Sequence, residues 1–289
     1  MLDTSTMRAG NAPAPAARIK RYRPSFGRCM LLSSAALVLA FILLPLVFVI
    51  WMSVFRQEIP TFPPDGYSLR WFKAVFGQAV FVQGLLLSLQ VTAMATLLAM
   101  ALGTAAALAL VRTKMPFKGF FNNLLLTPMV LPGVVLGAAI YVAQIEVEML
   151  TQWPLLGSFW GLALAHALVV LPWVVRLIGA NLVGLDPAIE EAAKNLGAHP
   201  WAVFWRITLP SIRPGLVAAA LLGGVISFGN LEMSLFLVGP GETTLPIAIL
   251  QYLEWKIDPT VAAVSVMQIL LIAVALIASD RFVRLSRIV

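Results

Sequence analysis

The sequence contains few charged residues and almost no cysteine or histidine. Asp, Glu, Lys and Arg make up 11% of its 289 residues, against roughly 25% in typical soluble domains, whereas hydrophobic residues make up 60%. Its two histidines and the single Cys29 exclude an intramolecular disulfide and offer no cluster at metal-ligand spacing. This composition excludes an ordinary water-soluble domain and predicts an integral membrane protein.

The motifs of catalysis are missing as well. No Gly-x-x-x-x-Gly-Lys-Ser/Thr loop is present to cradle ATP, and neither an HExxH motif nor paired carboxylates occur. No histidine stands beside a candidate serine nucleophile. We therefore expect a chain that is not an enzyme and that has no cofactor or metal of its own.

Most hydrophobic residues fall into six long runs. A helix needs ~20 apolar residues to cross the hydrocarbon core, and the qualifying runs are 30–55, 80–111, 120–145, 155–175, 216–238 and 261–279. We predict an all-α integral membrane domain of six transmembrane helices over residues 30–289, behind a basic, disordered tail at residues 1–29. The first run is too long for the apolar part of a signal peptide, so we expect it to remain as a span.

The basic residues indicate the orientation of these spans. Lysine and arginine are retained on the cytoplasmic side, and 16 of the 20 fall there if the N-terminus is placed inside. The exceptions are Arg56, Arg70, Lys73 and Lys256. Both termini are therefore predicted to be cytoplasmic, and we attribute the net charge of +7 to topology and contact with anionic lipid rather than to nucleic acid.

The joint between the fourth and fifth runs is predicted at 176–213, and its coupling loop, residues 183–213, has the signals of two short helices. Asp186 and Pro187 are suited to cap and begin a helix, and Gly197 is suited to end it. Between them, the pattern predicts an apolar face with Ile189, Ala192, Ala193 and Leu196, and a polar face with Glu190, Glu191, Lys194 and Asn195. A second helix can begin at Pro200. It is apolar almost all round, so we expect the membrane domain or another protein to cover it.

The same joint carries an extended motif. Glu191-Ala192-Ala193 is followed after three residues by Gly197, and after nine more by Ile207, one residue and Leu209-Pro210. This spacing resembles the EAA signature of ABC importer permeases, and the chain is similar to their type I family over nearly all residues after 30. The resemblance implies that the joint docks on a separate ATPase subunit, which Glu191 faces, and that Gly197 lets the two helices turn.

The resemblance also implies a coupling site and a set of partners. It assigns coupling to the ATPase subunit to Glu190, Glu191, Ala192, Ala193, Gly197, Ile207, Leu209 and Pro210. The partners are an ATPase dimer that binds ATP, a periplasmic solute-binding protein and, because a symmetric dimer offers two clefts, a second permease, identical or homologous. Transport would then proceed by alternating access. A channel or a secondary transporter would have no use for such a joint.

Three softer matches favour the spermidine/putrescine branch of the family. They are Thr127-Pro128 with Leu131-Pro132-Gly133, Ser227-Phe228 ahead of residues 234–240, and residues 244–246 running to 258–260. In this branch an acidic residue usually follows the serine and phenylalanine, whereas Gly229-Asn230 stand there in this sequence. We expect a polyamine as the solute. The alternatives are an amino-acid derivative, a phosphonate or iron.

Glu232 is the charged residue inside the fifth run, where a carboxylate needs a partner or a wet cavity. In one interpretation, Ser227, Asn230 and Glu232 line a solute pathway with Gln268 of the sixth run, and the carboxylate attracts a cation. In the other, Glu232 lies at the outer interface or meets the partner permease. His166 of the fourth run is interpreted as a packed or hydrogen-bonded side chain rather than a metal or proton site.

Replacement of Glu191 or Gly197 is expected to uncouple ATP hydrolysis from transport while leaving membrane insertion intact. The reason is that both residues lie at the joint that receives the motion of the ATPase, outside the spans. Uptake and ATPase activity of the assembled importer, measured beside membrane-inserted protein, test this. Retained transport in both variants would contradict the coupling role.

Overall fold

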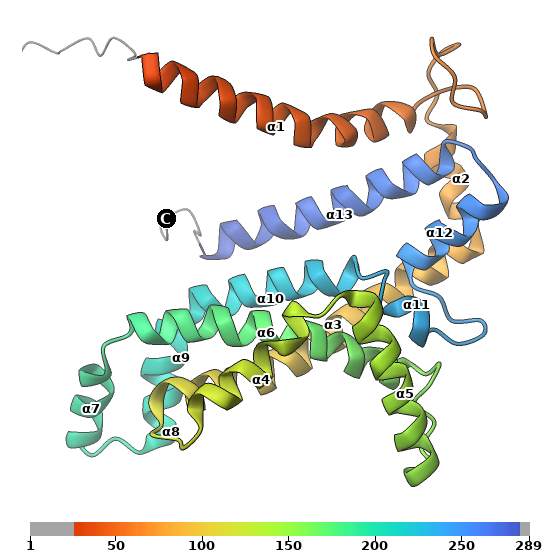
Figure 1. Ribbon diagram of the computed structural model, residues 1–289. Helices are drawn as coiled ribbons and strands as arrows, with labels where there is room; N and C mark the ends of the chain where they lie inside the picture. The colour runs from red at the N-terminus through yellow and green to blue at the C-terminus, as the bar shows by residue number, and fades with distance from the viewer. Residues whose placement is uncertain (1–25, 284–289) are drawn as a thin grey trace, which may run out of the picture. The chain divides into compact units, whose positions relative to one another are not determined.

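The computed structural model describes residues 26–283, so most of the tail predicted at 1–29 lies outside the described residues. These residues form helices and connecting loops, without a named strand. The helices, labelled in Figure 1, are α1 (Phe26–Met52), α2 (Arg70–Gly77), α3 (Ala79–Arg112), α4 (Lys118–Val130), α5 (Gly133–Thr151), α6 (Phe159–Gly184), α7 (Pro187–Asn195), α8 (Pro200–Val203), the π-helical turn η1 (Phe204–Thr208), α9 (Leu209–Ser211), α10 (Arg213–Phe228), α11 (Ser234–Leu237), α12 (Leu245–Trp255) and α13 (Thr260–Val283).

Within the described part, the number of membrane-crossing helices agrees with the sequence. Five helices are long and apolar enough to span a bilayer, namely α1, α3, α5, α6 and α13. A sixth is obtained when the segment Pro200–Ser211 and α10, bent by 67°, are taken as one span. The prediction of six transmembrane helices is therefore confirmed when this bent pair is counted as one span.

The chain divides into two compact units, residues 1–47 and 48–289. Most of α1 belongs to the first unit, where Leu37 and Phe41 are exposed. In the second unit, the Trp51 ring packs edge-on against Phe55 and Phe62. A helix as exposed and apolar as α1 requires lipid or another protein around it.

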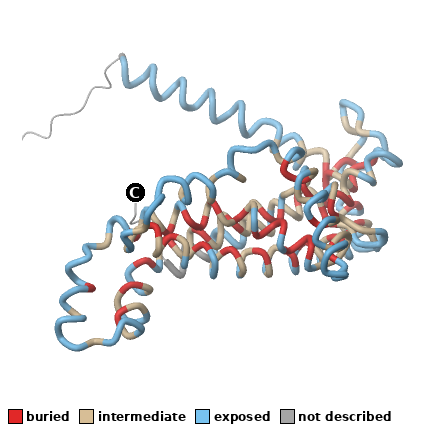
Figure 2. Tube along the Cα trace, turned by 60° about the horizontal axis from the view of Figure 1, so that its bottom comes forward, coloured by how far each residue is buried: buried red, intermediate tan, exposed pale blue. Residues whose placement is uncertain are grey.

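The core of the second unit is formed by α3, α6 and α10, which pack along one another (Figure 1). Buried residues follow these helices in Figure 2. The contact faces use small side chains on α3, such as Ala99 and Ala107, against Val170 and Val174 of α6. Gly103 allows the closest approach, because a Cβ there would lie 2.6 Å from Val174 Cγ1. Small residues are the usual means by which helices approach closely in lipid.

Two of the predicted spans are interrupted. The third, 120–145, is divided into α4 and α5 at Leu131 and Pro132, because proline lacks the backbone N–H that would continue the helix. The fifth, 216–238, was predicted too long: α10 ends at Phe228, and the chain turns before α11 begins. The fourth was predicted too short, since α6 continues to Gly184 and contains Arg176.

Two short helices were not predicted, α2 and α12. Both segments are too short to span a membrane, and they pack with α3 and α13 through Trp71, Phe81 and Leu245. The backbone N–H of Leu245, at the start of α12, donates to Ser88 Oγ of α3 over 2.8 Å. The amino-terminal half of α3 therefore holds α12.

The start of α13 is fixed by Asp258. Its Oδ1 accepts from the backbone N–H of Thr260 (2.9 Å), while Oδ2 accepts from the Tyr252 hydroxyl (3.0 Å) and lies 3.2 Å from Lys256 Nζ. Burial acts to raise the pKa of this carboxyl, but the hydrogen bonds from Thr260, Lys256 and Tyr252 outweigh it and lower the pKa below the ordinary value.

Substituting alanine at two helical glycines is expected to change stability in opposite directions. Gly103→Ala should destabilise by about 1–3 kcal/mol because its Cβ meets Val174. Gly179→Ala should stabilise by up to about 1 kcal/mol, since that position in α6 has open space and alanine favours the helix. Thermal unfolding of the detergent-purified variants measures both, and equal shifts would contradict the packing described for α3 and α6.

Candidate coupling hairpin and solute pathway

The predicted joint at 183–213 forms a helical hairpin between α6 and α10. Asp186 Oδ1 accepts from the backbone N–H of Ala188 (2.9 Å), which caps α7 as expected. Gly197 has a φ of +87°, a left-handed conformation that strains any side chain other than glycine and that ends the helix. The second arm begins at Pro200 and continues through η1 to Ser211, with Ile207, Leu209 and Pro210 inside it. The two predicted helices and the glycine stop are confirmed.

The orientation of α7 differs from the prediction. Glu190, assigned to the polar face, is only 8% exposed, whereas Ile189 and Leu196 of the predicted apolar face are 51% and 90% exposed. Glu191 and Ala192 are also exposed, and Ala193 is half-buried. The cause is a polar contact that turns Glu190 inward. The surface presented outward by α7 thus combines Glu191 with apolar side chains.

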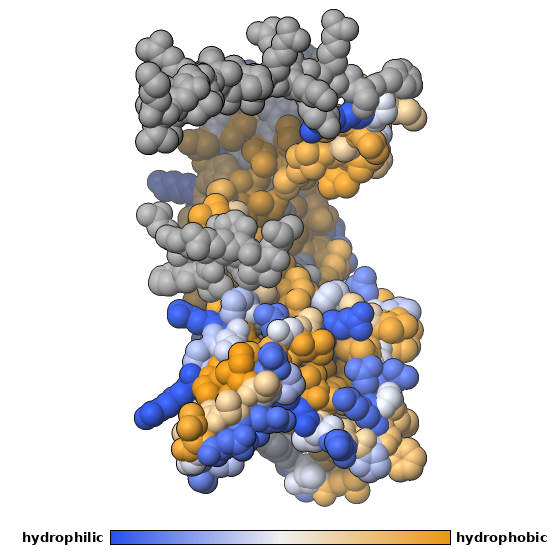
Figure 3. Space-filling model, turned by 90° about the vertical axis from the view of Figure 1, so that its left-hand side faces the viewer, coloured by the Kyte–Doolittle hydropathy of each residue, from blue (hydrophilic) through white to orange (hydrophobic). Residues whose placement is uncertain are grey.

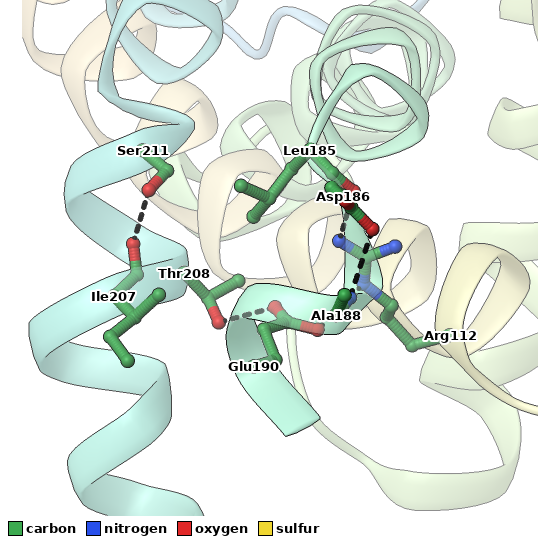
Figure 4. Close-up of polar contacts among 8 residues, drawn as sticks. All are labelled: Arg112, Leu185, Asp186, Ala188, Glu190, Ile207, Thr208 and Ser211. Carbon is green, nitrogen blue, oxygen red and sulfur yellow. Dashed lines mark hydrogen bonds and ion pairs between the residues drawn. The ribbon is translucent and has the colours of Figure 1, made fainter. Parts of the chain in front are cut away.

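Glu190 joins the two arms of the hairpin to α3 (Figure 4). Its Oε1 accepts from the hydroxyl of Thr208 in η1 over 2.6 Å. Its Oε2 lies 3.0 Å from Nε of Arg112, the last residue of α3, without an aligned hydrogen bond. Arg112 Nη2 also donates to the carbonyl of Leu185, where α6 leads into the hairpin (3.0 Å). Sequence reasoning placed Arg112 on the cytoplasmic side and gave no signal of this contact.

The rest of the hairpin surface is partly apolar. Trp201 and Trp205 are exposed, and orange side chains lie among blue ones in the lower part of Figure 3. A cleft of about 510 Å³ separates α3 from the second arm and is lined by residues including Met100, Leu108 and Phe204. The apolar second arm is therefore not fully covered within the described part of this chain, so of the two predicted kinds of cover, the membrane domain alone does not suffice.

The break in the fifth span is held by His166 of α6. Its Nδ1 lies 2.9 Å from Ser227 Oγ, at the end of α10, and its Nε2 lies 2.9 Å from Ser234 Oγ, at the start of α11. Ser234 Oγ donates to the carbonyl of Asn230 (2.8 Å). Because a hydroxyl has one proton, this pattern assigns the ring proton to Nε2 and makes Ser227 the donor to Nδ1. The interpretation of His166 as a hydrogen-bonded side chain is confirmed.

The four predicted pathway residues do not share one wall. Asn230 lies in the break, and Ser227 is buried against His166 beside it. Glu232 follows in the same turn and is exposed. Gln268 lies in a different cavity of about 70 Å³, lined by apolar side chains of α2, α3, α12 and α13. The structure therefore brings three of the four to the break.

The two broken spans meet at Glu232. Its carboxylate lies against Gly133, the first residue of α5, where a Cβ would overlap it. One turn further along α5, a Cβ on Gly137 would lie 2.9 Å from Met233 Cα. Among residues 26–283, Glu232 has no hydrogen-bond or ion-pair partner. An exposed carboxylate thus stands where α4–α5 and α10–α11 are both interrupted.

Removal of the His166 ring is expected to destabilise the protein by about 1–3 kcal/mol, because Ser227 would be left buried without its partner. His166→Ala can be compared with Ser265→Ala, which removes a local bond to the Val261 carbonyl within α13 and should cost less than about 0.5 kcal/mol. Thermal unfolding in detergent provides the measurement. Similar losses in the two variants would contradict the bridging role of His166.

Known proteins resemble this chain along most of its length. A family model described as "Binding-protein-dependent transport system inner membrane component" matches residues 95–287. The chain is 33% identical over 202 residues to the putrescine transport system permease protein PotI of Escherichia coli strain K12, covering 69% of this chain and 72% of that protein. It is 34% identical over 216 residues to the molybdenum transport system permease protein ModB of the same strain, covering 71% and 94%.

A solved structure shows the same fold. The crystal structure of a bacterial ABC transporter involved in the import of the acidic polysaccharide alginate aligns with a TM-score of 0.70. The aligned region covers 90% of this chain and 99% of that one, at 16% identity. The helices of this chain therefore adopt an arrangement found in an ABC transporter.

Proposed function

This chain belongs to the family of inner-membrane components of binding-protein-dependent transport systems, and from that premise we propose that it forms half of an import pathway for putrescine or spermidine. As an ABC importer permease, it is a membrane component and does not itself catalyse a reaction. In the proposed assembly, a second permease supplies the other half, and a dimer of ATPase subunits hydrolyses ATP. A periplasmic protein delivers the solute.

The unpaired carboxylate of Glu232 is the observation that favours a cationic solute. An ionised group in the middle of a membrane costs roughly 2.5–3.5 kcal/mol, so it is retained where a partner or water meets it. In transporters, interrupted helices surround solute sites because their free backbone groups line a cavity. Glu232 stands at two such interruptions, and an amine of a polyamine is the complement of its charge.

The two relatives point to different solutes. PotI carries putrescine in its name, which supports a polyamine. ModB, matched over 94% of its length, makes molybdenum the second candidate. For either solute the proposed mechanism is the same: the hairpin passes motion of the ATPase subunits to α6 and α10 as rigid bodies. The exposed face of α7 around Glu191 is the surface proposed to meet the ATPase.

Uptake of labelled putrescine and spermidine by cells that express the complete importer tests the proposal. Wild type should show saturable uptake, and Glu232→Gln should reduce it about tenfold or more, equivalent to ~1.4 kcal/mol of lost charge interaction. Glu242→Gln is the matched control, because Glu242 is another exposed acid between α11 and α12 and should leave uptake unchanged. Saturable uptake of molybdate with none of either polyamine would overturn the proposal and favour the second candidate.

A further inference from the structure

Arg112 lies where four helical elements converge. Arg112 is the last residue of α3, and it donates to the carbonyl of Leu185, the residue that follows α6. It also lies beside Glu190 of α7, whose carboxylate accepts a hydrogen bond from Thr208 of η1 (Figure 4). The hairpin is covalently continuous with α6 and α10. Its contact with Arg112 ties it to a further span, α3, that is remote in the sequence.

The contact is well suited to fixing position. The side chains of Arg112 and Glu190 are 19% and 10% exposed, so the pair is largely shielded from water and salt. Each group also has a second partner, Leu185 for Arg112 and Thr208 for Glu190, which limits its rotation. A planar guanidinium has several N–H donors in fixed directions, so it can contact the carboxylate and the carbonyl at the same time. The single ammonium of a lysine cannot reproduce that geometry.

At its other end, α3 holds α12. Ser88 Oγ accepts from the backbone N–H of Leu245, and a Cβ on Gly84 would lie 3.2 Å from Leu245 Cα. Between Ser88 and Arg112, α3 is a continuous α-helix of roughly 36 Å at 1.5 Å per residue. The charge pattern predicts that α12 lies on the outer side, opposite the hairpin. One uninterrupted helix therefore touches the hairpin at one end and α12 at the other.

We propose that Arg112 is a positioning residue that ties the hairpin to α3, so that the hairpin and α12 move together. The proposal rests on the hairpin's proposed contact with the ATPase and is independent of the solute. It assigns α3 a role beside the two spans that flank the hairpin. A signal from the outer side would reach the ATPase through α12, α3 and the pair of Arg112 with Glu190.

The test uses the complete importer in lipid vesicles and measures how far its own binding protein stimulates ATP hydrolysis. In wild type we expect stimulation of about fivefold or more, a usual size for coupling between sites. Arg112→Gln should retain basal hydrolysis and lower the stimulation to less than about twofold. Lys114→Gln is the matched control, since Lys114 is an exposed basic residue two positions beyond α3 and should behave as wild type.

A double-mutant cycle separates this role from general damage. If the two residues act as one unit, Glu190→Gln and Arg112→Gln/Glu190→Gln should both show the same loss as Arg112→Gln, whereas independent effects would multiply. The proposal would be overturned if the losses of the two single variants multiplied in the double variant. It would also be overturned if the binding protein stimulated ATP hydrolysis by the Arg112→Gln importer as much as it stimulates wild type. If Arg112→Gln does not assemble, Arg112→Lys keeps the charge and removes the guanidinium that contacts Glu190 and Leu185 together. Unchanged stimulation in that variant would likewise overturn it.

The readout distinguishes this inference from the proposed function. Stimulation by the binding protein does not require putrescine to be the solute, so a failure of polyamine uptake leaves it measurable. If the wild-type importer hydrolysed ATP at the same rate with and without its binding protein, there would be no signal for α3 to transmit, and the inference would be overturned. Normal polyamine uptake and normal stimulation in Arg112→Gln would overturn the inference alone.

Discussion

In lipid, the backbone of a membrane protein has to satisfy its own hydrogen bonds, and the rest of this structure depends on that constraint. It accounts for the continuous helices α3 and α6, which pack through small residues over much of their length. It also restricts where a helix can be interrupted. In the turn after Phe228, the Asn230 side chain accepts from the backbone N–H of Met233, and the Ser234 hydroxyl donates to the Asn230 carbonyl. His166 then joins the hydroxyls of Ser227 and Ser234 on either side of the turn.

The same constraint separates the two kinds of polar site in the molecule. The break at Ser227–Ser234 is stabilised by neutral groups, which can be buried in a membrane at moderate cost. The contact of Arg112 with Glu190 uses full charges and lies at the end of α3, beside a hairpin with several exposed polar residues. Glu232 is the exception, a charge at a break, and this is why it is the residue on which the proposed solute depends.

Local sequence signals were sufficient for much of the fold and for the bounds of the hairpin. Asp186-Pro187 and Gly197 act within one turn of themselves, and the predicted loop 183–213 agrees with helices that end at Gly184 and begin at Arg213. The start of the joint, predicted at 176, lies inside α6. The orientation of Glu190 was not predictable, because it depends on a partner in α3. The contacts of Arg112 with Leu185 and of His166 with Ser227 and Ser234 join residues 73, 61 and 68 positions apart. Amphipathic patterning does not reveal such partners, so it placed Glu190 toward solvent. The interpretation that put Gln268 on one wall with Glu232 likewise had no information on which helices are neighbours.

The π-helical turn η1 has a consequence for the length of the hairpin. A π turn accommodates one more residue than an α turn, and Thr208 is its last residue. The nine residues between Gly197 and Ile207 include this extra one. If the same residues instead formed a regular α-helix without the wider turn, every later side chain would rotate by about 100°. Thr208 would leave the carboxylate of Glu190, so the register of the second arm, and not only its composition, determines whether the two arms are joined.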